Sequence, residues 1–255
     1  MKIEYKATNY ESDLTDKQWE EIKEFFPSGN KSKYPKRAMA EAVLYIIHTG
    51  CQWRMLPHDY PPYTAVWSFY RRAKLNGNWD KMLRHLVTIT RKNAERNEKP
   101  SCALIDSQSV KSVGKGEKRG YDGGKTKGIK RHIVTDTMGN LLAVHVHAAN
   151  IHDTKGGVYT FEKALFRYPS ITGVCADGAY RKHFRKTFTE FYDKKVDIAQ
   201  RLTPGFQVIH HRRKVERTFG WANFSRRLSK DYERTVSSSE TMFIISHAHT
   251  LLKRL

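Results

Sequence analysis

The hydrophobic and polar positions of this chain follow two different periods, one before and one after a charged segment at residues 93–100. In the first part, apolar residues recur every three or four positions, which is the spacing of a helix that buries one face. Four helices are predicted there, at residues 15–26, 36–49, 64–76 and 79–91. Thr15 or Asp16 is placed to cap the first helix and Thr64 the third. Gly50 is placed to end the second.

After residue 100 the pattern changes to short apolar or alternating runs, which are typical of strands. Strands are predicted at residues 102–107, 129–135, 141–148, 171–176 and 196–200. Helices are predicted at 153–166, capped by Asp153 or Thr154, at 181–194, at 210–229, and after a capping box of Ser237 and Glu240. The second and third strands flank a turn and form a β-hairpin. This order is that of an RNase H-like domain, so we predict an α+β or α/β fold with a mixed sheet.

Composition adds a strong positive charge to this picture. The 255 residues include 46 Lys and Arg against 26 Asp and Glu, a formal net charge of +20. Such an excess favours a polyanionic partner, either nucleic acid or an anionic membrane surface. The apolar runs are far shorter than the roughly 20 residues that span a bilayer, and the N-terminus lacks a signal-peptide core. We therefore expect a cytoplasmic protein that contacts no membrane, and its three scattered cysteines predict free, buried thiols.

The third predicted helix has an apolar stripe on one face and Arg71, Arg72 and Lys74 on the other. A helix, a turn and a second helix with a basic outer face are typical of a helix-turn-helix DNA reader. A small helical bundle in any basic protein has the same pattern, so both interpretations stand. We assign residues 1–97 to a helical DNA-binding domain and residues 98–255 to the RNase H-like domain.

Three acidic residues are distinguished by their positions. Asp106 and Asp177 each lie at the end of a predicted strand, and Glu216 lies within a run of Arg and Lys. Two carboxylates on neighbouring strands and a third from a packed helix are oxygen ligands suited to the paired Mg²⁺ ions of phosphoryl transfer. Each acid also has a simpler interpretation. Asp106 can cap a strand end, and Asp177 can be a turn residue. Glu216 can form an ion pair with Arg212 or Arg213 on a helix surface.

Basic residues near these acids are candidates for contacts with DNA phosphates. The Gly- and Lys-rich segment at residues 111–130 is either a solvated loop or a loop that follows a phosphate backbone. It lacks the spacing of a P-loop. Besides the three on the third helix, the candidate DNA-binding residues are Lys111, Lys125, Lys127, Lys130, Arg131, Arg212, Arg213, Lys214 and Arg217.

The histidines offer a different chemistry. His145 and His147 share one strand face, and His152 precedes Asp153. A zinc or manganese site is the weaker alternative, because no Cys and no HExxH helix supports it. The other acids that compete for a metal role are Asp122, Asp136, Asp153 and Asp231. Asp136 is set apart from the strand-end acids by its place in the predicted hairpin turn.

Longer motifs complete the interpretation. They are Leu-Thr-Asp-Lys-Gln-Trp at 14–19, Thr-Gly-Cys-Gln-Trp-Arg-Met-Leu-Pro at 49–57, Ile-Asp-Ser-Gln-Ser-Val-Lys at 105–111, Ala-Asp-Gly-Ala-Tyr at 176–180 and Val-Glu-Arg-Thr-Phe-Gly-Trp at 215–221. Through these motifs the chain resembles, over nearly its whole length, bacterial DDE transposases of the insertion-sequence-five family, in the insertion-sequence-four/five-like superfamily.

The resemblance implies that Asp106, Asp177 and Glu216 form the DDE triad, with Mg²⁺ as cofactor and Mn²⁺ as a substitute. It implies terminal inverted repeats and target DNA as partners, a homodimer in the DNA complex, and association with the nucleoid when DNA is bound. It implies cleavage at the element's 3′ end followed by strand transfer. A metal-dependent nuclease of the same fold and a domesticated DNA-binding protein are the alternatives.

Related transposases often have a Tyr, Arg, Glu, Lys pattern around the glutamate. Arg212 fits the Arg position here, but Ile209 stands at the Tyr position and Asn223 at the Lys position. The groups that hold the terminal phosphate are therefore left open, with the local cations as candidates.

Overall fold

The computed structural model describes residues 4–27, 29, 33–124, 126–199 and 210–255, with only the backbone at 210–212. Helices fill the first part of the chain, as predicted. They are α1 (Asp16–Ile22), α2 (Lys36–Thr49), α3 (Tyr63–Leu75) and α4 (Asn78–Asn93). Thr15 and Gln18 form a capping box at the start of α1. Helix α2 ends at Gly50, whose φ of 73° lies in the left-handed region that glycine adopts without strain.

Three predicted helix caps are wrong. Helix α3 follows Pro62 without a side-chain cap, so Thr64 lies inside the helix. Helix α5 (Asp153–Arg167) is capped by His152. Helix α8 (Val236–Leu252) is capped by Thr235, which accepts a hydrogen bond from the backbone N–H of Ser238. The Asp153 and Glu240 carboxylates are bound elsewhere in the fold, and local capping preferences do not register such partners.

The sheet has the RNase H-like arrangement. Its strands are β1 (Cys102–Lys111), β2 (Gly120–Tyr121), β3 (Lys127–Asp136), β4 (Leu141–Ala148), β5 (Gly173–Ala176) and β6 (Lys195–Ile198). The main order is β4-β3-β1-β5-β6, and β2 pairs with the start of β3. Strand β3 is antiparallel to both β1 and β4, whereas β1, β5 and β6 are parallel. The predicted mixed sheet is confirmed.

Strand β1 is longer than predicted. Its antiparallel pairing with β3 continues to the pair formed by Lys111 and Gly128. Both ends of the predicted loop at 111–130 are therefore strand. The middle of the segment is anchored as well, because the backbone N–H of Val113 donates to the carbonyl of Asp231 and that of Glu117 donates to the carbonyl of Arg234.

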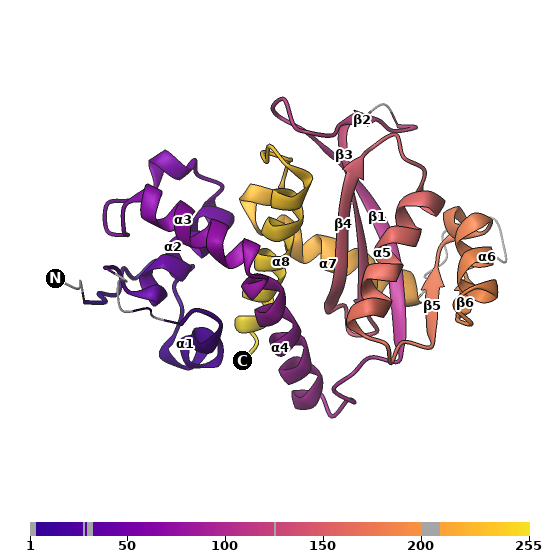
Figure 1. Ribbon diagram of the computed structural model, residues 1–255, viewed down its shortest axis with the longest axis horizontal. Coiled ribbons are helices and arrows are strands. Elements are labelled where there is room, and N and C mark those ends of the chain that lie inside the picture. The colour runs from indigo at the N-terminus through magenta and orange to yellow at the C-terminus, as the bar shows by residue number, and fades with distance from the viewer. Residues whose placement is uncertain (1–3, 28, 30–32, 125, 200–209) are drawn as a thin grey trace.

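Helices cover both faces of the sheet (Figure 1). Helix α5 crosses one face and packs against α6 (His183–Glu190). Helix α7 (His210–Asn223) crosses the other face and contacts β1 and β3. It ends at Asn223, before the predicted end at residue 229, and a short 3₁₀ helix, η4 (Arg226–Leu228), follows.

Side chains from two helices close the outer edge of β4. The backbone N–H of Val146 donates to Glu240 Oε1 of α8 at 3.0 Å. The carbonyl of Val144 accepts from Lys163 Nζ of α5 at 2.9 Å, and the same ammonium bonds Glu240 at 2.8 Å. Edge groups left unpaired invite pairing with another chain. The two contacts to the strand remove part of that opportunity.

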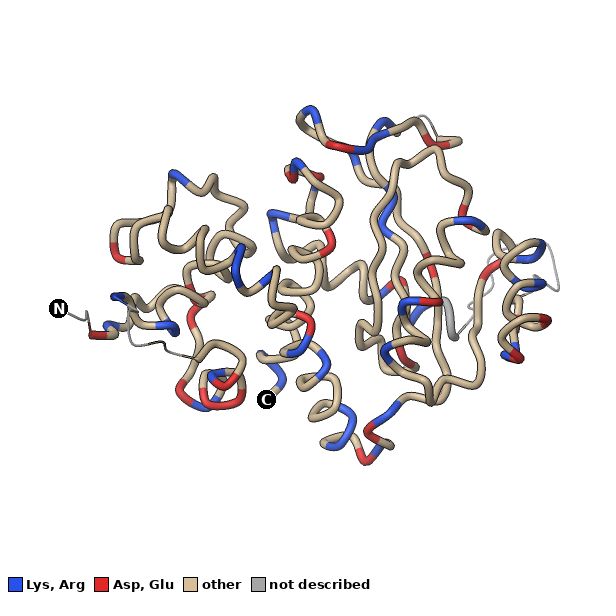
Figure 2. The backbone as a smooth tube through the Cα atoms, viewed as in Figure 1, with Lys and Arg blue, Asp and Glu red and all other residues tan. Residues whose placement is uncertain are grey.

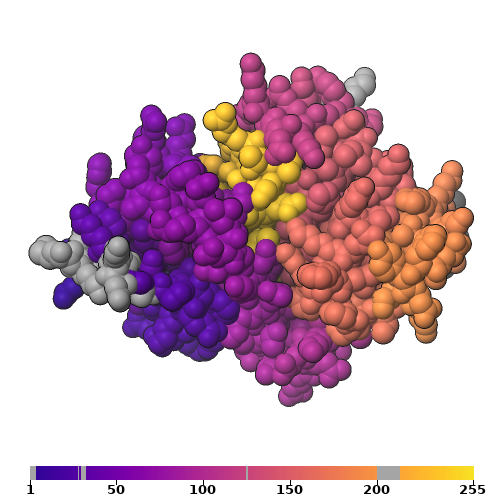
Figure 3. Space-filling model, viewed as in Figure 1, coloured from indigo at the N-terminus to yellow at the C-terminus, as the bar shows by residue number. Residues whose placement is uncertain are grey.

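Helix α8 joins the helical region to the sheet. It packs on α4 and α2 on one side and on β4 and α7 on the other. Figure 3 shows the C-terminal segment between the two parts of the molecule. His247 Nε2 accepts a hydrogen bond from the backbone N–H of Leu141 at 3.0 Å. One apolar core therefore runs through both parts. Among the described helices, none is long and apolar enough to cross a bilayer.

Candidate active site

The parallel pairing of β1 and β5 sets two of the predicted acids side by side. The paired residues end at Leu104 and Cys175, and the same register continued by two residues brings Asp106 level with Asp177, which directly follows β5. Side chains two residues apart point to the same face of a strand. The two carboxylates therefore lie at the same level on neighbouring strands. Asp177 follows β5 as predicted, whereas Asp106 lies within β1 and does not end it.

Local hydrogen bonds orient both carboxylates. Asp106 Oδ1 accepts from the backbone N–H of Ser107 at 2.7 Å. Asp177 Oδ1 accepts from the backbone N–H of Ala179 at 2.9 Å, which caps the 3₁₀ helix η3 (Gly178–Tyr180). Both acids are half-buried. They are thus held in place while part of each remains open to solvent.

Tyr180 lies close to this pair, and sequence reasoning missed it. Its side chain is 1% exposed. Burial raises the pKa of Tyr180 well above its usual value, and the nearby charges of Asp106, Asp153 and Asp177 add to the rise. The phenol stays neutral and can donate a hydrogen bond among carboxylates. The motif at 176–180 contains it, but spacing alone gave no reason to choose it.

Glu216 comes from α7, the helix that crosses β1. Val215, Thr218 and Phe219 are buried and form the inner face of this helix. Glu216 and Arg217 are on the exposed side. The helix contacts β1, the strand of Asp106, so all three predicted acids belong to elements that are neighbours in space.

The three acids do not form a closed metal cage. Among the residues that the structure describes, no three His, Cys, Asp or Glu side chains are placed to share a metal ion. A Mg²⁺ ion that acts on phosphates normally takes one or two carboxylates and completes its coordination with water and substrate oxygens. The pair of half-buried carboxylates fits that requirement. Their hard oxygen donors also suit Mn²⁺.

A buried polar network supports the strand that carries Asp106. Asp153 Oδ1 accepts from Ser107 Oγ at 2.9 Å and from Lys130 Nζ at 2.8 Å. Burial opposes ionisation of Asp153, but the hydrogen bond and charge of Lys130 outweigh it and lower its pKa. His132 Nδ1 and His147 Nε2 are 2.8 Å apart in the same interior. Burial lowers the pKa of His132 to about 3, with a further contribution from His147.

The alternative histidine metal site is not supported within the described part of the chain. His147 is bound to His132. His145 Nδ1 contacts Glu240 Oε1 at 3.1 Å, and His152 caps α5. These contacts occupy the histidines with structural partners.

The competing acids are structural too. Asp136 is fully buried against Arg91. Asp231 is 4% exposed and accepts from Ser239 Oγ at 2.6 Å. Asp122 accepts from the backbone N–H of Thr126 at 2.8 Å.

Three of the predicted DNA contacts are used inside the protein. Arg131 is 2% exposed and donates to the carbonyl of Leu228 at 2.8 Å. Lys130 is held by Asp153, and half-buried Lys74 donates to Ser238 Oγ at 3.0 Å. We therefore remove Lys130 and Arg131 from the DNA-facing set, because burial and bonded partners take up their charges. Lys74 ties α3 to α8 instead.

The other predicted cations are more accessible. Lys214 is half-buried, and Lys125 and the Arg212 side chain lie outside the described residues. The exposed members are Arg71, Arg72, Lys111, Lys127, Arg213 and Arg217. They lie on α3, β1, β3 and α7, and Figure 2 shows Lys and Arg distributed over both parts of the molecule. Arg213 and Arg217 flank Glu216 on the same helix.

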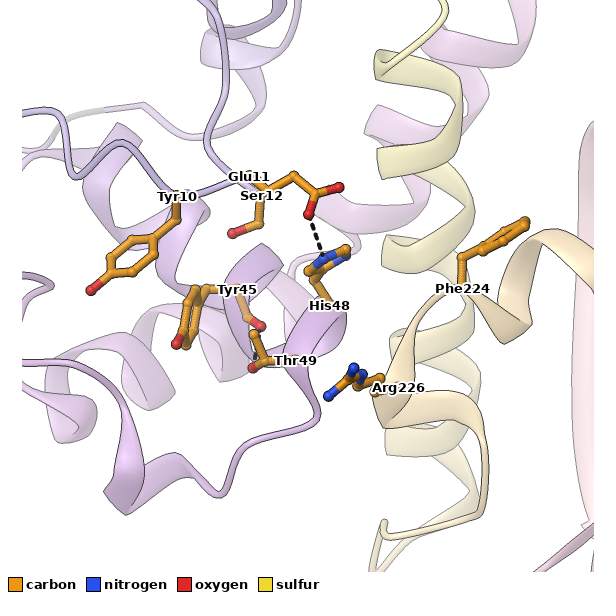
Figure 4. Close-up of a pocket in the computed structure, with 8 residues that line it drawn as sticks. All are labelled: Tyr10, Glu11, Ser12, Tyr45, His48, Thr49, Phe224 and Arg226. Atoms are coloured by element: carbon orange, nitrogen blue, oxygen red, sulfur yellow. Dashed lines mark hydrogen bonds and ion pairs between the residues drawn. The ribbon is translucent and has the colours of Figure 1, made fainter.

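A separate hollow lies where the helical region meets the segment after α7. It has a volume of about 520 Å³, and Tyr45, His48, Phe224 and Arg226 are among the residues that line it (Figure 4). His48 Nε2 lies 3.6 Å from a carboxylate oxygen of Glu11. Phe224 is 78% exposed. None of the three predicted acids lines this hollow.

Comparisons with known proteins agree with the predicted family. The sheet topology places the protein in the RNase H-like class. Residues 14–83 match a family model described as a putative transposase of the IS4/5 family. Residues 97–251 match the model of the transposase DDE domain. The chain belongs to the DDE transposase family, which confirms the resemblance.

The two sequence relatives each cover less than half of the chain. It is 28% identical over 117 residues to the insertion element IS402 uncharacterized 16.2 kDa protein of Burkholderia cepacia, which covers 42% of this chain and 78% of that protein. It is 38% identical over 74 residues to the uncharacterized protein y4sN of Sinorhizobium fredii, and the match covers 28% of this chain and 59% of that protein. The Mos1 mariner paired end complex with Mn is 14% identical, with 94% of this chain and 84% of that chain covered. Its TM-score of 0.26 is too low to support an argument.

Proposed function

We propose that this protein is a DNA transposase in which Asp106, Asp177 and Glu216 form the acid site for cleavage and strand transfer. The observation that carries the proposal is the parallel register of β1 and β5, which, continued by two residues, brings Asp106 level with Asp177. Helix α7 brings the third acid across the same strand. Three acids on neighbouring elements are consistent with the DDE transposase family to which the chain belongs.

The reaction would use one site twice. A water oxygen forms a bond to phosphorus at the end of the element, and the bond from phosphorus to the 3′ oxygen breaks. The new 3′-hydroxyl then attacks a phosphodiester of target DNA, which forms one phosphodiester and releases another 3′-hydroxyl. Positioning and charge stabilisation carry such reactions, with little need for protein acid–base groups.

The acids would hold Mg²⁺, or Mn²⁺ in its place. The bound ions supply Lewis-acid stabilisation of the negative charge that develops on the phosphate oxygens. The protein's task is to hold Asp106 and Asp177 by their backbone hydrogen bonds and Glu216 by the packing of α7. Tyr180 would keep a neutral hydroxyl beside these carboxylates.

DNA would be held by the exposed cations. Arg213 and Arg217, which flank Glu216, would contact the reacting strand, while Arg71 and Arg72 on α3 would contact the terminal inverted repeat. We propose residues 1–97 as the unit that recognises the repeat, and a homodimer as the form that brings two element ends together. The exposed Phe224 beside Arg226 would add a stacking contact outside the acid site.

A strand-transfer assay tests this function. A pre-cut duplex with the element's own end is incubated with plasmid target and Mg²⁺, beside an Asp106→Ala control that is checked for DNA binding. Joined product that disappears in the control supports the transposase. Cleavage without joining would indicate a nuclease, and DNA binding without either reaction would indicate a domesticated binding protein.

A further inference from the structure

The turn between β3 and β4 is built around one buried carboxylate. Asp136 is fully buried, and its Oδ1 accepts hydrogen bonds from the backbone N–H groups of Met138 at 2.8 Å and Asn140 at 2.9 Å. Its Oδ2 accepts from the side-chain amide of Asn140 at 2.9 Å. Gly139 completes the turn with a φ of 86°, in the left-handed region that suits glycine. These bonds hold the turn in one conformation.

The helical region forms an ion pair with the same carboxylate. Arg91, near the end of α4, donates from Nη1 to Asp136 Oδ2 at 2.6 Å. Its Nε donates to the carbonyl of Asn97 at 2.6 Å, just before the chain enters β1. Both charged side chains are nearly inaccessible to solvent. Separating a buried ion pair leaves charges without partners, so the end of α4 and the turn are held firmly together.

Helix α7 rests directly on this turn. Thr218 is fully buried and donates from Oγ1 to the carbonyl of Gly139 at 2.8 Å. Arg217 donates to the carbonyl of Met138 at 2.9 Å. A Cβ added at Gly139 would lie 3.1 Å from Thr218 Oγ1 and 3.2 Å from the carbonyl oxygen of Lys214. The absence of a side chain at this position lets the helix backbone approach the turn.

These contacts bracket the third acid of the proposed site. Lys214 and Thr218 lie two residues before and two residues after Glu216. A helix turns about 100° and rises 1.5 Å per residue, so the hydrogen bonds of Arg217 and Thr218 to the turn fix both its rotation and its translation at residue 216. The direction in which Glu216 leaves the helix is therefore set by the turn.

We propose that the β3–β4 turn is a positioning device for Glu216, with Thr218, Gly139 and Arg91 as its positioning residues. The turn links the end of the helical region to the acid site through the buried ion pair of Arg91 and Asp136. The proposal rests on the proposed catalytic role of Glu216. A misplacement of about 1 Å in such a site can reduce a rate about 100-fold, so a small shift of α7 has a large consequence.

The test compares three threonine variants of the full-length protein. Thr218→Val keeps the shape of the side chain but removes the donor to Gly139, whereas Thr218→Ser keeps the donor. Thr241→Val is the matched control, because Thr241 lies on α8 and donates within its own helix to the carbonyl of Ser237. Each variant is assayed for joining rate at saturating pre-cut DNA, for the Mg²⁺ concentration at half-maximal rate, for DNA affinity and for thermal unfolding.

If the turn positions Glu216, the variants should differ in joining rate and in Mg²⁺ dependence. Thr218→Val should lower the joining rate about 10-fold or more and raise the Mg²⁺ concentration needed for half-maximal rate, with unchanged DNA affinity. Thr218→Ser should restore both values to near those of the unmodified protein. Arg91→Lys, which keeps the charge but loses one of the two hydrogen bonds, should change the same two values in the same direction.

The contrary result is equally clear. If Thr218→Val matches Thr241→Val in rate and Mg²⁺ dependence while both remain folded, the turn contributes only to stability and the proposal is overturned. A Glu216→Gln variant distinguishes a failure of the positioning proposal from a failure of the proposed function. If Glu216→Gln joins DNA at the normal rate, the catalytic role of Glu216 is itself wrong.

Discussion

The β3–β4 turn and the strand-level acid pair use the same residue type in opposite ways. Asp136 is sealed from solvent, and its two oxygens take four hydrogen bonds, one of them from a guanidinium. Asp106 and Asp177 are oriented by backbone N–H groups yet remain half-exposed. The first arrangement uses its carboxylate to build structure. The second keeps its carboxylates ordered while the two residues stay partly exposed to solvent.

The difference shows what separates a structural acid from a candidate ligand. A buried carboxylate is stable only when its charge is matched by donors, and once matched it has little capacity for another ligand. A ligand for Mg²⁺ must be ordered but accessible, because water and substrate complete the coordination. Solvent access therefore distinguishes these acids better than their position in the chain does.

The largest predicted effect is on activity at the acid pair. Asp106→Asn or Asp177→Asn should reduce joining by more than about 100-fold, since the loss of even an outer-shell partner of a metal ligand costs 10- to 100-fold. Thermal stability should be retained, because each substitution removes one of two neighbouring like charges. Parallel joining and thermal-unfolding measurements check this. If a variant loses thermal stability as well as joining activity, the substituted acid has a structural role like that of Asp136.

The opposite result is expected in the turn. Asp136→Asn should lower the free energy of unfolding by about 3–5 kcal/mol, because Arg91 keeps a buried charge without a counter-ion. Urea denaturation measures the loss. Asp193→Asn is the control, since Asp193 is exposed and has a φ of 48° that asparagine tolerates well. Equal stability of the two variants would contradict the structural role of Asp136.

Acid should weaken the packed interior of the protein. Burial lowers the pKa of His132, His247 and His249 to about 3, so each binds fewer protons when folded than when unfolded. The contribution of these neutral histidines to the free energy of unfolding is fully present above the ordinary histidine pKa of about 6.5. It is lost as the pH falls from there toward 3. Each contributes a slope of about 1.4 kcal/mol per pH unit. Unfolding free energies at pH 7 and pH 5 measure it.

One histidine gives this prediction a control. His247 Nε2 must be unprotonated to accept from the backbone N–H of Leu141, which follows the turn. His247→Gln retains an acceptor without a titrating group, so it should reduce the pH dependence between pH 7 and pH 5. An unchanged pH dependence would exclude His247 as a source.

The smallest effects are expected from single exposed cations. DNA affinity should fall with salt, and Arg213→Gln should lower the slope of log affinity against log salt by about 0.9, the value for one phosphate contact on duplex DNA. Fluorescence anisotropy over a range of salt concentrations checks this. Exposed Lys81 on α4 provides the comparison: Lys81→Gln should leave the slope unchanged if the DNA path follows α7. Equal changes in both variants would indicate binding without a defined path.

The order of elements, the mixed sheet and most helices could be predicted from the sequence, because apolar spacing follows secondary structure closely. The true strand ends of β1 and β3 were missed, since Gly128 and its lysine-rich surroundings have low strand propensity and are held there by pairing alone. The caps at Thr235 and His152 were missed because Glu240 and Asp153, which look like caps, have partners far away in the chain.

For the candidate site, the sequence indicated the three acids but not their surroundings. Arg131 looks like a DNA contact in the sequence, yet it is buried under the carbonyl of Leu228, which lies 97 residues away. Tyr180 and Thr218 carry no local signal of their roles, because those depend on a strand register and on a turn distant in sequence. Long-range packing decides which charges reach solvent, and local patterns cannot report it.

Localised cleavage by Fe²⁺ tests the central claim most directly. Fe²⁺ bound in place of Mg²⁺ generates hydroxyl radicals with ascorbate and peroxide, and these cut the backbone near the bound ion. We predict cuts near Asp106 and Asp177 that compete with added Mg²⁺ and disappear in Asp106→Asn, with a further cut near Glu216 when DNA is bound. Cuts near His145 and His147, or cuts that persist in Asp106→Asn, would contradict the claim that these strand-level carboxylates hold the metal.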